Sequence, residues 1–332
     1  MKNPDFDWVE NGLETRLYIQ HFVTEIPLSF EPFLYQTADY LNAQNCDRRF
    51  SFYLFRKGEA LSAACIHFTN IDTSFVSPLR APFGGVQCDE KCKANELSFF
   101  LRCVEDWFSS QTNATKCIIR TAATCYKSAD KHFLLFNSYE TAGYKITRKF
   151  INHHIPVSRS PFVNTIIPAE RRRLAKCRKS GFQAELYAKP DFEIVYNFIH
   201  NSRSEKGYLM SMTPKQVDVL INKFPHQCRI FVVRDESKII AMSVTVLVSK
   251  GILYNFLPAD LSDYKSFSPM VYLLETVYNY CQKEEIRILD LGISTDHHGI
   301  EKPGLLKFKK NLGGIESFKI TYEKKIEVLL GN

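Results

Sequence analysis

The chain has 332 residues, of which 45% are hydrophobic and 24% charged. This length exceeds what one hydrophobic core usually serves, so two domains are expected, and the composition is that of an ordinary globular protein. No run of about eighteen apolar residues is present, and the N-terminus lacks the apolar segment of a signal peptide. The sequence therefore predicts no transmembrane segment.

The charge and the cysteines narrow the class of protein further. A formal net charge of +7 permits an anionic partner without requiring one. The ten cysteines are scattered and contain no CxxC pair. This pattern favours free thiols in a cytoplasmic protein over a disulfide framework or a zinc site.

The first half of the chain combines a hairpin with helices. Two β-rich runs flank the turn Lys57-Gly58-Glu59, which is typical of a hairpin, and Gly143 follows a helix as a C-terminal glycine. In chain order we predict a helix at 31–41, strands at 50–56, 60–69 and 74–77, a helix at 97–108, a strand at 117–120, a helix at 131–141 and an extended segment at 144–157.

The second half repeats this order after two additional helices. Pro258 is expected to end the third strand, and Ser268 to cap the helix that begins at Pro269. The predicted elements are helices at 191–204 and 214–224, strands at 229–234, 238–248 and 251–258, a helix from 269, a strand at 286–291, a short basic helix and a final strand. Together with the pairing of Gly143 with Gly314, this order predicts an internal duplication in an α/β fold, with domains at 1–157 and 158–332.

Two short motifs add a family resemblance to this order. The first half has an SP…GG element, carried by Ser77, Pro78, Gly84 and Gly85. The second half ends in an FK…GG pattern, carried by Phe308, Lys309, Lys310, Asn311, Leu312, Gly313 and Gly314. With the basic segment RRRLAKCRKSG, the chain resembles the Fem-type (FemABX-like) acyl and aminoacyl transferases. The resemblance implies two tandem GNAT-like (acyl-CoA N-acyltransferase) domains, each with a mixed central sheet flanked by helices.

The resemblance also implies an activity. Known members move an amino acid from aminoacyl-tRNA onto a peptidoglycan precursor of the bacterial cell wall, and relatives are N-acyltransferases. We therefore expect transfer of an acyl or aminoacyl group to an amine, with acyl-CoA or aminoacyl-tRNA as donor and no metal. One departure is clear: where simple GNAT enzymes hold the CoA pyrophosphate with a glycine-rich turn, this chain reads LSDYKSFSPM.

Three residues are candidates for the chemistry. By its place in the FK…GG motif, Lys309 resembles the family lysine that stabilises charge, although the lysines at 307, 309 and 310 could equally form the solvated face of a helix. Tyr254 lies on a predicted strand, where it could donate a hydrogen bond to substrate or belong to the core. His297 lies in the polar loop 296–298 and could act as a base near neutral pH. The neighbouring histidine is expected to point away from it, which disfavours a two-histidine metal site.

Cationic and polar residues are candidates for substrate binding. Arg203 stands where the family often has an arginine for an acceptor phosphate, or it could merely complement a helix dipole. The basic helix, which leaves Leu174 and Cys177 as a buried strip, could bind tRNA or nucleotide phosphates, or be a solvated surface. The remaining predicted substrate-binding residues are Arg172, Arg173, Lys176, Lys307, Asp296 and Ser268.

Two further interpretations remain beside the enzyme with its site in the second domain. The absence of the glycine-rich turn favours a catalytically degenerate module that binds an anionic metabolite or a nucleotide-linked ligand. The basic helix alone suggests a nucleic-acid binder, but it lacks interleaved aromatic residues for base stacking. The histidines at 153 and 154, on a predicted strand, are interpreted as structural.

Overall fold

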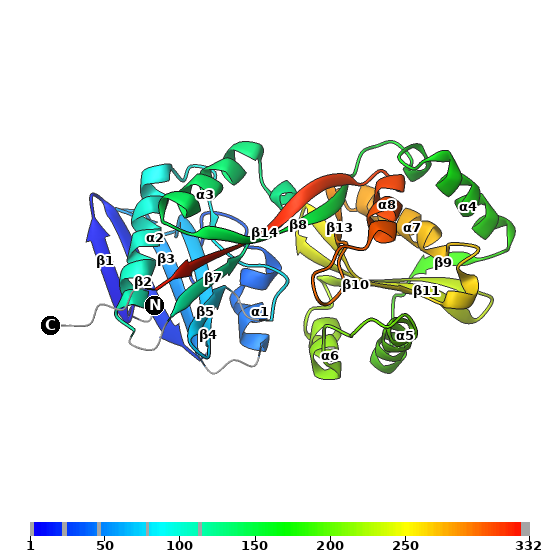
Figure 1. The fold of residues 1–332 in the computed structure, drawn as a ribbon, viewed down its shortest axis with the longest axis horizontal. Helices are drawn as coiled ribbons and strands as arrows, with labels where there is room; N and C mark the ends of the chain where they lie inside the picture. Colours follow the sequence, from blue (N-terminus) through cyan, green and yellow to red (C-terminus); the bar gives the residue numbers. More distant parts are fainter. Residues whose placement is uncertain (1–2, 22–24, 45–47, 78–79, 112–114, 327–332) are drawn as a thin grey trace. The chain divides into compact units, whose positions relative to one another are not determined.

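The computed structural model describes residues 3–21, 25–44, 48–77, 80–111 and 115–326. These form two compact units, each with a sheet and covering helices (Figure 1). Unit 1 comprises Met1–Phe150 and Phe318–Asn332, and unit 2 comprises Ile151–Ser317. Unit 1 therefore contains the end of the chain as well as its beginning.

The sheet of unit 1 has the strand order β1-β2-β3-β4-β5-β7-β14, with β6 beside β4. Its strands pair antiparallel except β5 and β7, which are parallel. The bounds are β1 (Phe6–Glu10), β2 (Leu13–Gln20), β3 (Arg49–Arg56), β4 (Ala64–Ile71), β5 (Ser74–Ser77), β6 (Gln87–Cys88), β7 (Lys116–Arg120) and β14 (Ile315–Lys325).

Two long helices pack on this sheet and build an aromatic core. They are α2 (Ala94–Ser109) and α3 (Ala129–Thr141), and the short helices of the unit are η1 (Leu34–Gln36), α1 (Ala38–Ala43) and η2 (Thr124–Tyr126). Leu97, Leu101 and Val104 recur at helical spacing on α2 and are buried, as predicted. Phe108 of α2 stacks on Phe75 of β5 with ring centroids 4.2 Å apart. The hydrophobic face of α2 thus fixes the helix over the middle of the sheet.

The sheet of unit 2 has the order β8-β13-β12-β11-β10-β9. Only β12 and β13 are parallel. The bounds are β8 (Lys145–Pro156), β9 (Gln183–Leu186), β10 (Cys228–Asp235), β11 (Lys238–Ser249), β12 (Ile252–Asp260) and β13 (Ile288–Ile293). The predicted hairpin at 229–248 and the crossover from β12 to β13 through a helix are therefore confirmed.

Helices cover both faces of this second sheet (Figure 1). α4 (Pro168–Lys179) and α7 (Pro269–Lys283) lie on one face, where Leu174, Cys177 and Leu274 join a core with the sheet. α5 (Phe192–Glu205) and α6 (Pro214–Lys223) lie on the other. The remaining elements are η3 (Phe162–Asn164), η4 (Ser262–Tyr264) and the short helix α8 (Pro303–Asn311).

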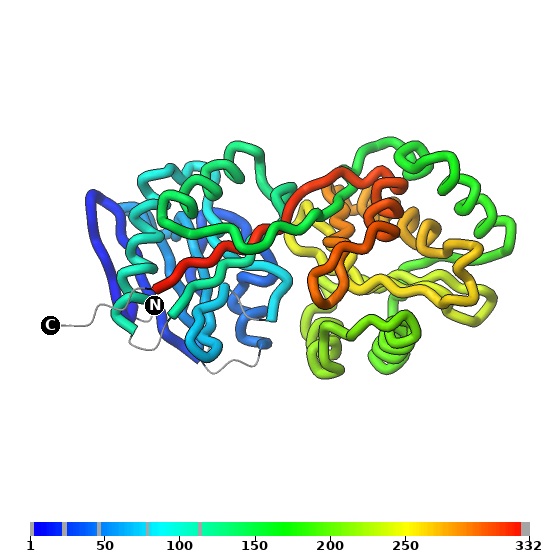
Figure 2. The backbone as a smooth tube through the Cα atoms, in the orientation of Figure 1, coloured from blue at the N-terminus to red at the C-terminus, as the bar shows by residue number. Residues whose placement is uncertain are grey.

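The two units exchange their last strands. β8 ends the first run of the repeated order, yet it pairs antiparallel with β13 in unit 2. β14 ends the second run, yet it pairs antiparallel with β7 in unit 1. Figure 2 follows the chain along both strands. Each sheet is consequently completed by a strand from the other half of the sequence, an arrangement that no local pattern encodes.

Four local predictions need correction. The helix predicted at 31–41 is η1 followed by α1, and the strand predicted from residue 60 begins at Ala64. β12 passes through Pro258 and ends at Asp260, because β13 no longer pairs with β12 there and a missing N–H costs no hydrogen bond on that side.

Gly143 is equivalent to Gly313, since both have positive φ after a helix and the same hydrogen bonds. Within the SP…GG element, Pro78 lies outside the described residues.

Candidate functional site

The parallel strands of unit 2 diverge at one point. β12 and β13 pair from Ile252↔Ile288 to Tyr254↔Asp290, and both strands continue without pairing further. On the other side of β13, the register with β8 shifts between Asp290 and Gly292. Because backbone N–H and C=O groups must be satisfied, this divergence leaves backbone groups of β13 for side chains to bind.

Lys309 fills this role. It lies in α8, is 7% exposed, and its Nζ donates to the carbonyl oxygens of Gly292 at 2.9 Å and Ile293 at 2.7 Å. By contrast Lys307 is exposed, and Lys310 pairs with Glu316 at 2.6 Å. The three lysines are therefore not one solvated face: the ammonium of Lys309 is held at the end of β13, and the other two side chains point elsewhere.

The two glycines of the FK…GG motif hold this lysine in place. The N–H of Gly314 donates to Lys309 O at 3.0 Å and the N–H of Gly313 to Lys310 O at 2.9 Å, which is the Schellman pattern of a helix end. A Cβ on Gly313 would lie 2.6 Å from Thr165 O, and one on Gly314 would lie 2.6 Å from Lys309 O. Only glycine fits at either position.

A buried polar network lies beside Lys309. Asp290 is fully buried, and its Oδ1 accepts from the N–H of Gly292 and from Asn152 Nδ2, each at 2.8 Å. The same Asn152 Nδ2 donates to Ser317 Oγ at 3.1 Å. Asp290 thus fixes the β13 bulge. Asn152 and Ser317 have no sequence signal of their own, because they come together only through strand pairing.

His153 adjoins this network and is fully buried. Both of its ring nitrogens lack a hydrogen-bond partner among the described residues. Burial lowers the pKa of His153, and the positive charge of Lys309 lowers the pKa further, so the ring is neutral near pH 7. The sequence interpretation of this histidine as structural overlooked an unpartnered imidazole next to the candidate catalytic lysine.

Tyr254 and Arg203 are brought together on the α5 side of the divergence. Tyr254 is 9% exposed, and its ring lies so close to Gly292 that a Cβ there would approach Cε2 at 3.0 Å. Arg203, in the last turn of α5, is half-buried, and its Nε has no partner in the described structure. Burial lowers the pKa of Arg203, while the neighbouring Tyr254 raises it. An incompletely paired, partly desolvated guanidinium is well suited to an anionic ligand.

The polar loop after β13 is built around Asp296. Its Oδ1 accepts from the N–H groups of His298 at 2.9 Å and Ile300 at 3.0 Å, and Lys302 lies 3.1 Å from Oδ2. These backbone hydrogen bonds lower the pKa of Asp296. The rings of His297 and His298 do not point apart as predicted. Their centroids lie 3.9 Å apart, because the residues occupy a turn and not a strand.

The loop before α7 is closed on itself. The N–H groups of Phe267 and Ser268 both donate to Tyr264 O, at 2.9 and 3.2 Å. Ser268 does precede Pro269, but it has a φ of 57° and its side chain caps no amide. On α4, Cys177 Sγ donates a hydrogen bond to Phe267 O at 3.2 Å, and Lys176 Nζ donates one to Ser266 O at 3.1 Å. These amides therefore do not form the phosphate-binding turn of a simple GNAT enzyme.

Most cations of α4 have structural partners. Arg173 binds the fully buried Glu170 at 2.7 Å, and Arg178 binds Glu275 at 2.6 Å. Lys176 lies over the Phe267 ring at 4.2 Å. Arg172 is exposed, and no partner for it is seen within the described part of the chain. The basic helix thus presents a smaller free charge than its sequence suggests.

The described residues contain no helix long and apolar enough to cross a membrane. Among the same residues, no group of three or more His, Cys, Asp or Glu side chains is placed to hold a metal ion.

A GNAT-type acyltransferase domain is built around a parallel strand pair that diverges at one end, with polar side chains at the point of divergence. Residues 169–300 match a family model described as an acetyltransferase (GNAT) domain. The same plan recurs in unit 1, so the chain has a mixed α/β fold of two GNAT-like halves.

The particular likeness is to Fem-type proteins. The chain is similar to the crystal structure of FemX, with 13% identity, a TM-score of 0.63, and coverage of 83% of this chain and 88% of that chain. It is also similar to the C-terminal domain of a putative lysylphosphatidylglycerol synthetase from Agrobacterium fabrum, with 12% identity, a TM-score of 0.56 and 86% of each chain covered. A third neighbour is L-PGS from Bacillus licheniformis, with 12% identity, a TM-score of 0.52, and coverage of 80% and 82%. No curated protein matches the chain. The Fem-like GNAT fold implied by the sequence motifs is confirmed.

Proposed function

We propose that the protein is an acyltransferase that moves an acyl or aminoacyl group to an amine, with its reacting centre where β12 and β13 diverge. The observation that carries this proposal is the buried Lys309, whose ammonium is fixed by two carbonyls of β13. A positive charge held in a partly desolvated place stabilises the oxyanion that forms when an amine attacks an acyl carbon.

Each of the surrounding residues has a role in this proposal. Tyr254, beside Gly292, donates a hydrogen bond to the acyl oxygen, and Arg203 binds an anionic part of donor or acceptor. The base is one of two histidines. His297 is exposed on the loop after β13, whereas His153 is buried and neutral beside Lys309. A base must be unprotonated before it can accept the proton of the attacking amine.

The proposed donor and acceptor rest on the names of the structural neighbours. FemX, the domain of the putative lysylphosphatidylglycerol synthetase and L-PGS share the fold, which supports an aminoacyl or acyl donor such as aminoacyl-tRNA or acyl-CoA, and a nucleotide-linked cell-envelope precursor as acceptor. Arg172 and Lys307 are exposed cations that a tRNA could contact. The nine described cysteines are free, which fits a reducing compartment such as the cytoplasm.

The test begins with a thermal-shift panel of acetyl-CoA, a longer acyl-CoA, charged tRNA and a UDP-linked muropeptide. The best donor then enters a transfer assay with Lys309→Met and the matched variant Lys310→Met, whose lysine has only the surface pair with Glu316. We expect Lys309→Met to reduce the rate about 100-fold or more, and Lys310→Met to retain it. Equal rates in a folded Lys309→Met protein would contradict the proposal.

His153→Gln and His297→Gln identify the base in the same assay. The base is the histidine whose variant loses transfer activity while it retains ligand binding and an unchanged melting temperature. Arg203→Gln is expected to weaken the binding of the anionic ligand about tenfold or more, with Arg159→Gln as the exposed-arginine control. Unchanged binding in Arg203→Gln would remove Arg203 from the site.

The loop before α7 favours a second candidate, a binding module without catalysis. Its amides are bonded to Tyr264 and its carbonyls to α4, so the usual pyrophosphate cradle is absent from this described loop. This candidate predicts saturable binding of an anionic nucleotide-linked ligand with no transfer from any donor in the panel.

A further inference from the structure

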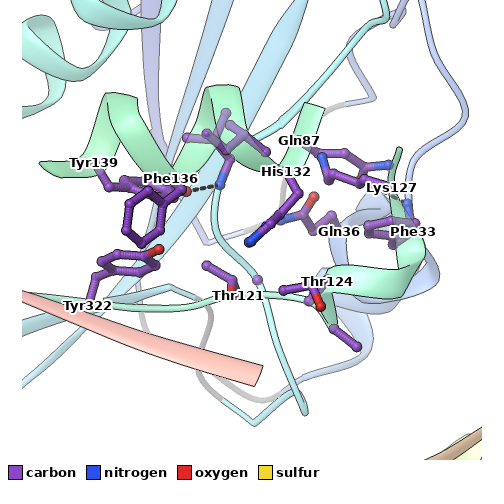
Figure 3. Close-up of a pocket in the computed structure, with 15 residues that line it drawn as sticks. Phe33, Gln36, Gln87, Thr121, Thr124, Lys127, His132, Phe136, Tyr139 and Tyr322 are labelled. Carbon is purple, nitrogen blue, oxygen red and sulfur yellow. Dashed lines mark hydrogen bonds between the residues drawn. The ribbon is translucent and has the colours of Figure 1, made fainter. Parts of the chain in front are cut away.

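Unit 1 contains a cavity at the position that corresponds to the Lys309 site of unit 2. It is lined by residues 121–124, which follow β7, and by residues of α3. In unit 2, the side chain of Lys309 from α8 likewise reaches the end of β13. The cavity has a volume of about 30 Å³ (Figure 3). A single water molecule needs about 10–15 Å³ on this measure, so about two or three fit.

Some polar groups around the cavity are engaged with the protein. Gln87 accepts from the N–H of Phe33 at 2.9 Å and donates to Glu31 O at 2.8 Å. The hydroxyl of Tyr139 accepts from the N–H of Val86 at 2.7 Å, the contact drawn in Figure 3. These groups fix the wall, and the aromatic ring of Phe136 makes part of it apolar.

Three other polar groups have no hydrogen-bond partner within the described residues. They are the ammonium of Lys127, the imidazole of His132 and the hydroxyl of Tyr322, all of which line the cavity. Lys127 is half-buried, and its Nζ lies 5.9 Å from the centroid of the Phe33 ring. In Figure 3 the His132 ring points into the space between Tyr322 and Gln36.

The electrostatics of this group call for a negative charge. Burial lowers the pKa of Lys127, although nearby thiols oppose the effect. Burial also lowers the pKa of His132, and the charge of Lys127 lowers it further. Lys127 and His132 are both partly desolvated, and a charge on one disfavours protonation of the other. An anion between them would stabilise the protonated form of both side chains. A carboxylate would accept hydrogen bonds from Lys127 and from an N–H of His132, whose charges interact, and a short aliphatic chain would contact the aromatic wall.

We propose that this cavity is a second ligand site, which binds a small aliphatic carboxylate of about the size of acetate or propionate. The site is independent of Lys309 and of acyl transfer. It uses the GNAT scaffold of unit 1 for binding, with Lys127 as the charged anchor and with His132 as its polar partner.

The test measures ligand binding in the absence of any acyl donor, so its outcome does not depend on the proposed transfer activity. Sodium acetate and propionate are titrated into the full chain at constant ionic strength, and binding is followed by calorimetry and by the histidine NMR signals. Acetamide serves as the neutral probe of the same shape. We expect saturable binding of the carboxylates, with acetamide at least about tenfold weaker.

The variants are Lys127→Met and the control Lys57→Met, whose lysine lies exposed in the β3–β4 turn of the same unit. Lys127→Met should lose binding by about tenfold or more, and Lys57→Met should retain it. If Lys127→Met does not fold, His132→Gln replaces it, with an expected severalfold loss. No saturable binding, equal binding of acetamide, or undiminished binding in a folded Lys127→Met protein would overturn the proposal.

Discussion

Lys309 in α8 and Tyr139 in α3 occupy the same position of the same helix-ending motif. The N–H of Gly314 donates to Lys309 O, and the N–H of Tyr144 donates to Tyr139 O, each at 3.0 Å. The lysine side chain reaches carbonyls at the end of β13, whereas the tyrosine hydroxyl accepts from the N–H of Val86. The two halves therefore keep one scaffold and place different chemistry at its corresponding point.

The helix end below Lys309 gives a first prediction. Gly313→Ala should lower the free energy of unfolding by at least about 2 kcal/mol, because it places a Cβ 2.6 Å from Thr165 O at a residue with a φ of 81°. Gly304→Ala, in the same helix but with open space around it, should leave stability unchanged or raise it by up to about 1 kcal/mol. Urea denaturation measures both, and equal effects would contradict the steric argument.

A second prediction concerns the approach of Tyr254 to β13. A Cβ on Gly292 would lie 3.0 Å from the Tyr254 ring, and the residue has a φ of 73°. Gly292→Ala should therefore cost about 1–3 kcal/mol and displace the tyrosine. Gly207→Ala provides the control, because Gly207 also has a positive φ, of 70°, but no atom lies within 4 Å of the added carbon. If the two variants lose the same stability, backbone strain alone accounts for the effect and the contact with Tyr254 is unimportant.

A third prediction tests a charge cluster in unit 1. Arg56 binds Asp89 at 2.8 Å and Glu96 at 2.6 Å, and the three side chains are 17%, 8% and 9% exposed. Arg56→Met should cost about 3 kcal/mol, because it leaves two carboxylates without their cation in a poorly solvated place. Arg102→Met removes an exposed pair with Glu10 and should cost less than about 1 kcal/mol. Thermal unfolding at neutral pH compares the two, and similar losses would refute the ranking by burial.

The pH dependence of unit 1 gives a fourth prediction. Burial lowers the pKa of His67 from 6.5 to about 3, and its Nδ1 lies 2.9 Å from Ser51 Oγ. Between these two pH values the unfolded state binds the proton and the folded state does not. Stability is therefore retained above about pH 6.5 and lost as the pH falls toward 3.

At pH 5 this loss should reach about 2 kcal/mol for His67 alone. His67→Gln should remove that share of the slope between pH 7 and pH 5, so the stability difference between wild type and variant should change by about 2 kcal/mol between these two pH values. Urea unfolding across this range decides it: the same slope in wild type and in a folded His67→Gln protein would show that His67 titrates normally.

Much of the local structure could be predicted from the sequence. The spacing of Leu97, Leu101 and Val104 specified α2, and the turn at Gly58 specified the β3–β4 hairpin, because these patterns depend on neighbouring residues only. The FK…GG motif, through its resemblance to the Fem-type family, pointed to the fold and to Lys309 as a candidate residue, and its glycines form the predicted helix end.

The tertiary structure decided the rest. The exchange of β8 and β14 depends on pairing between strands more than a hundred residues apart, and it is this pairing that joins Asn152 to Asp290 and Ser317. Burial likewise separates Lys309 from its neighbour Lys310, whose side chain forms a surface pair with Glu316. Local periodicity determines which elements form, but the desolvation and the partners of each charged group arise only when distant segments pack together.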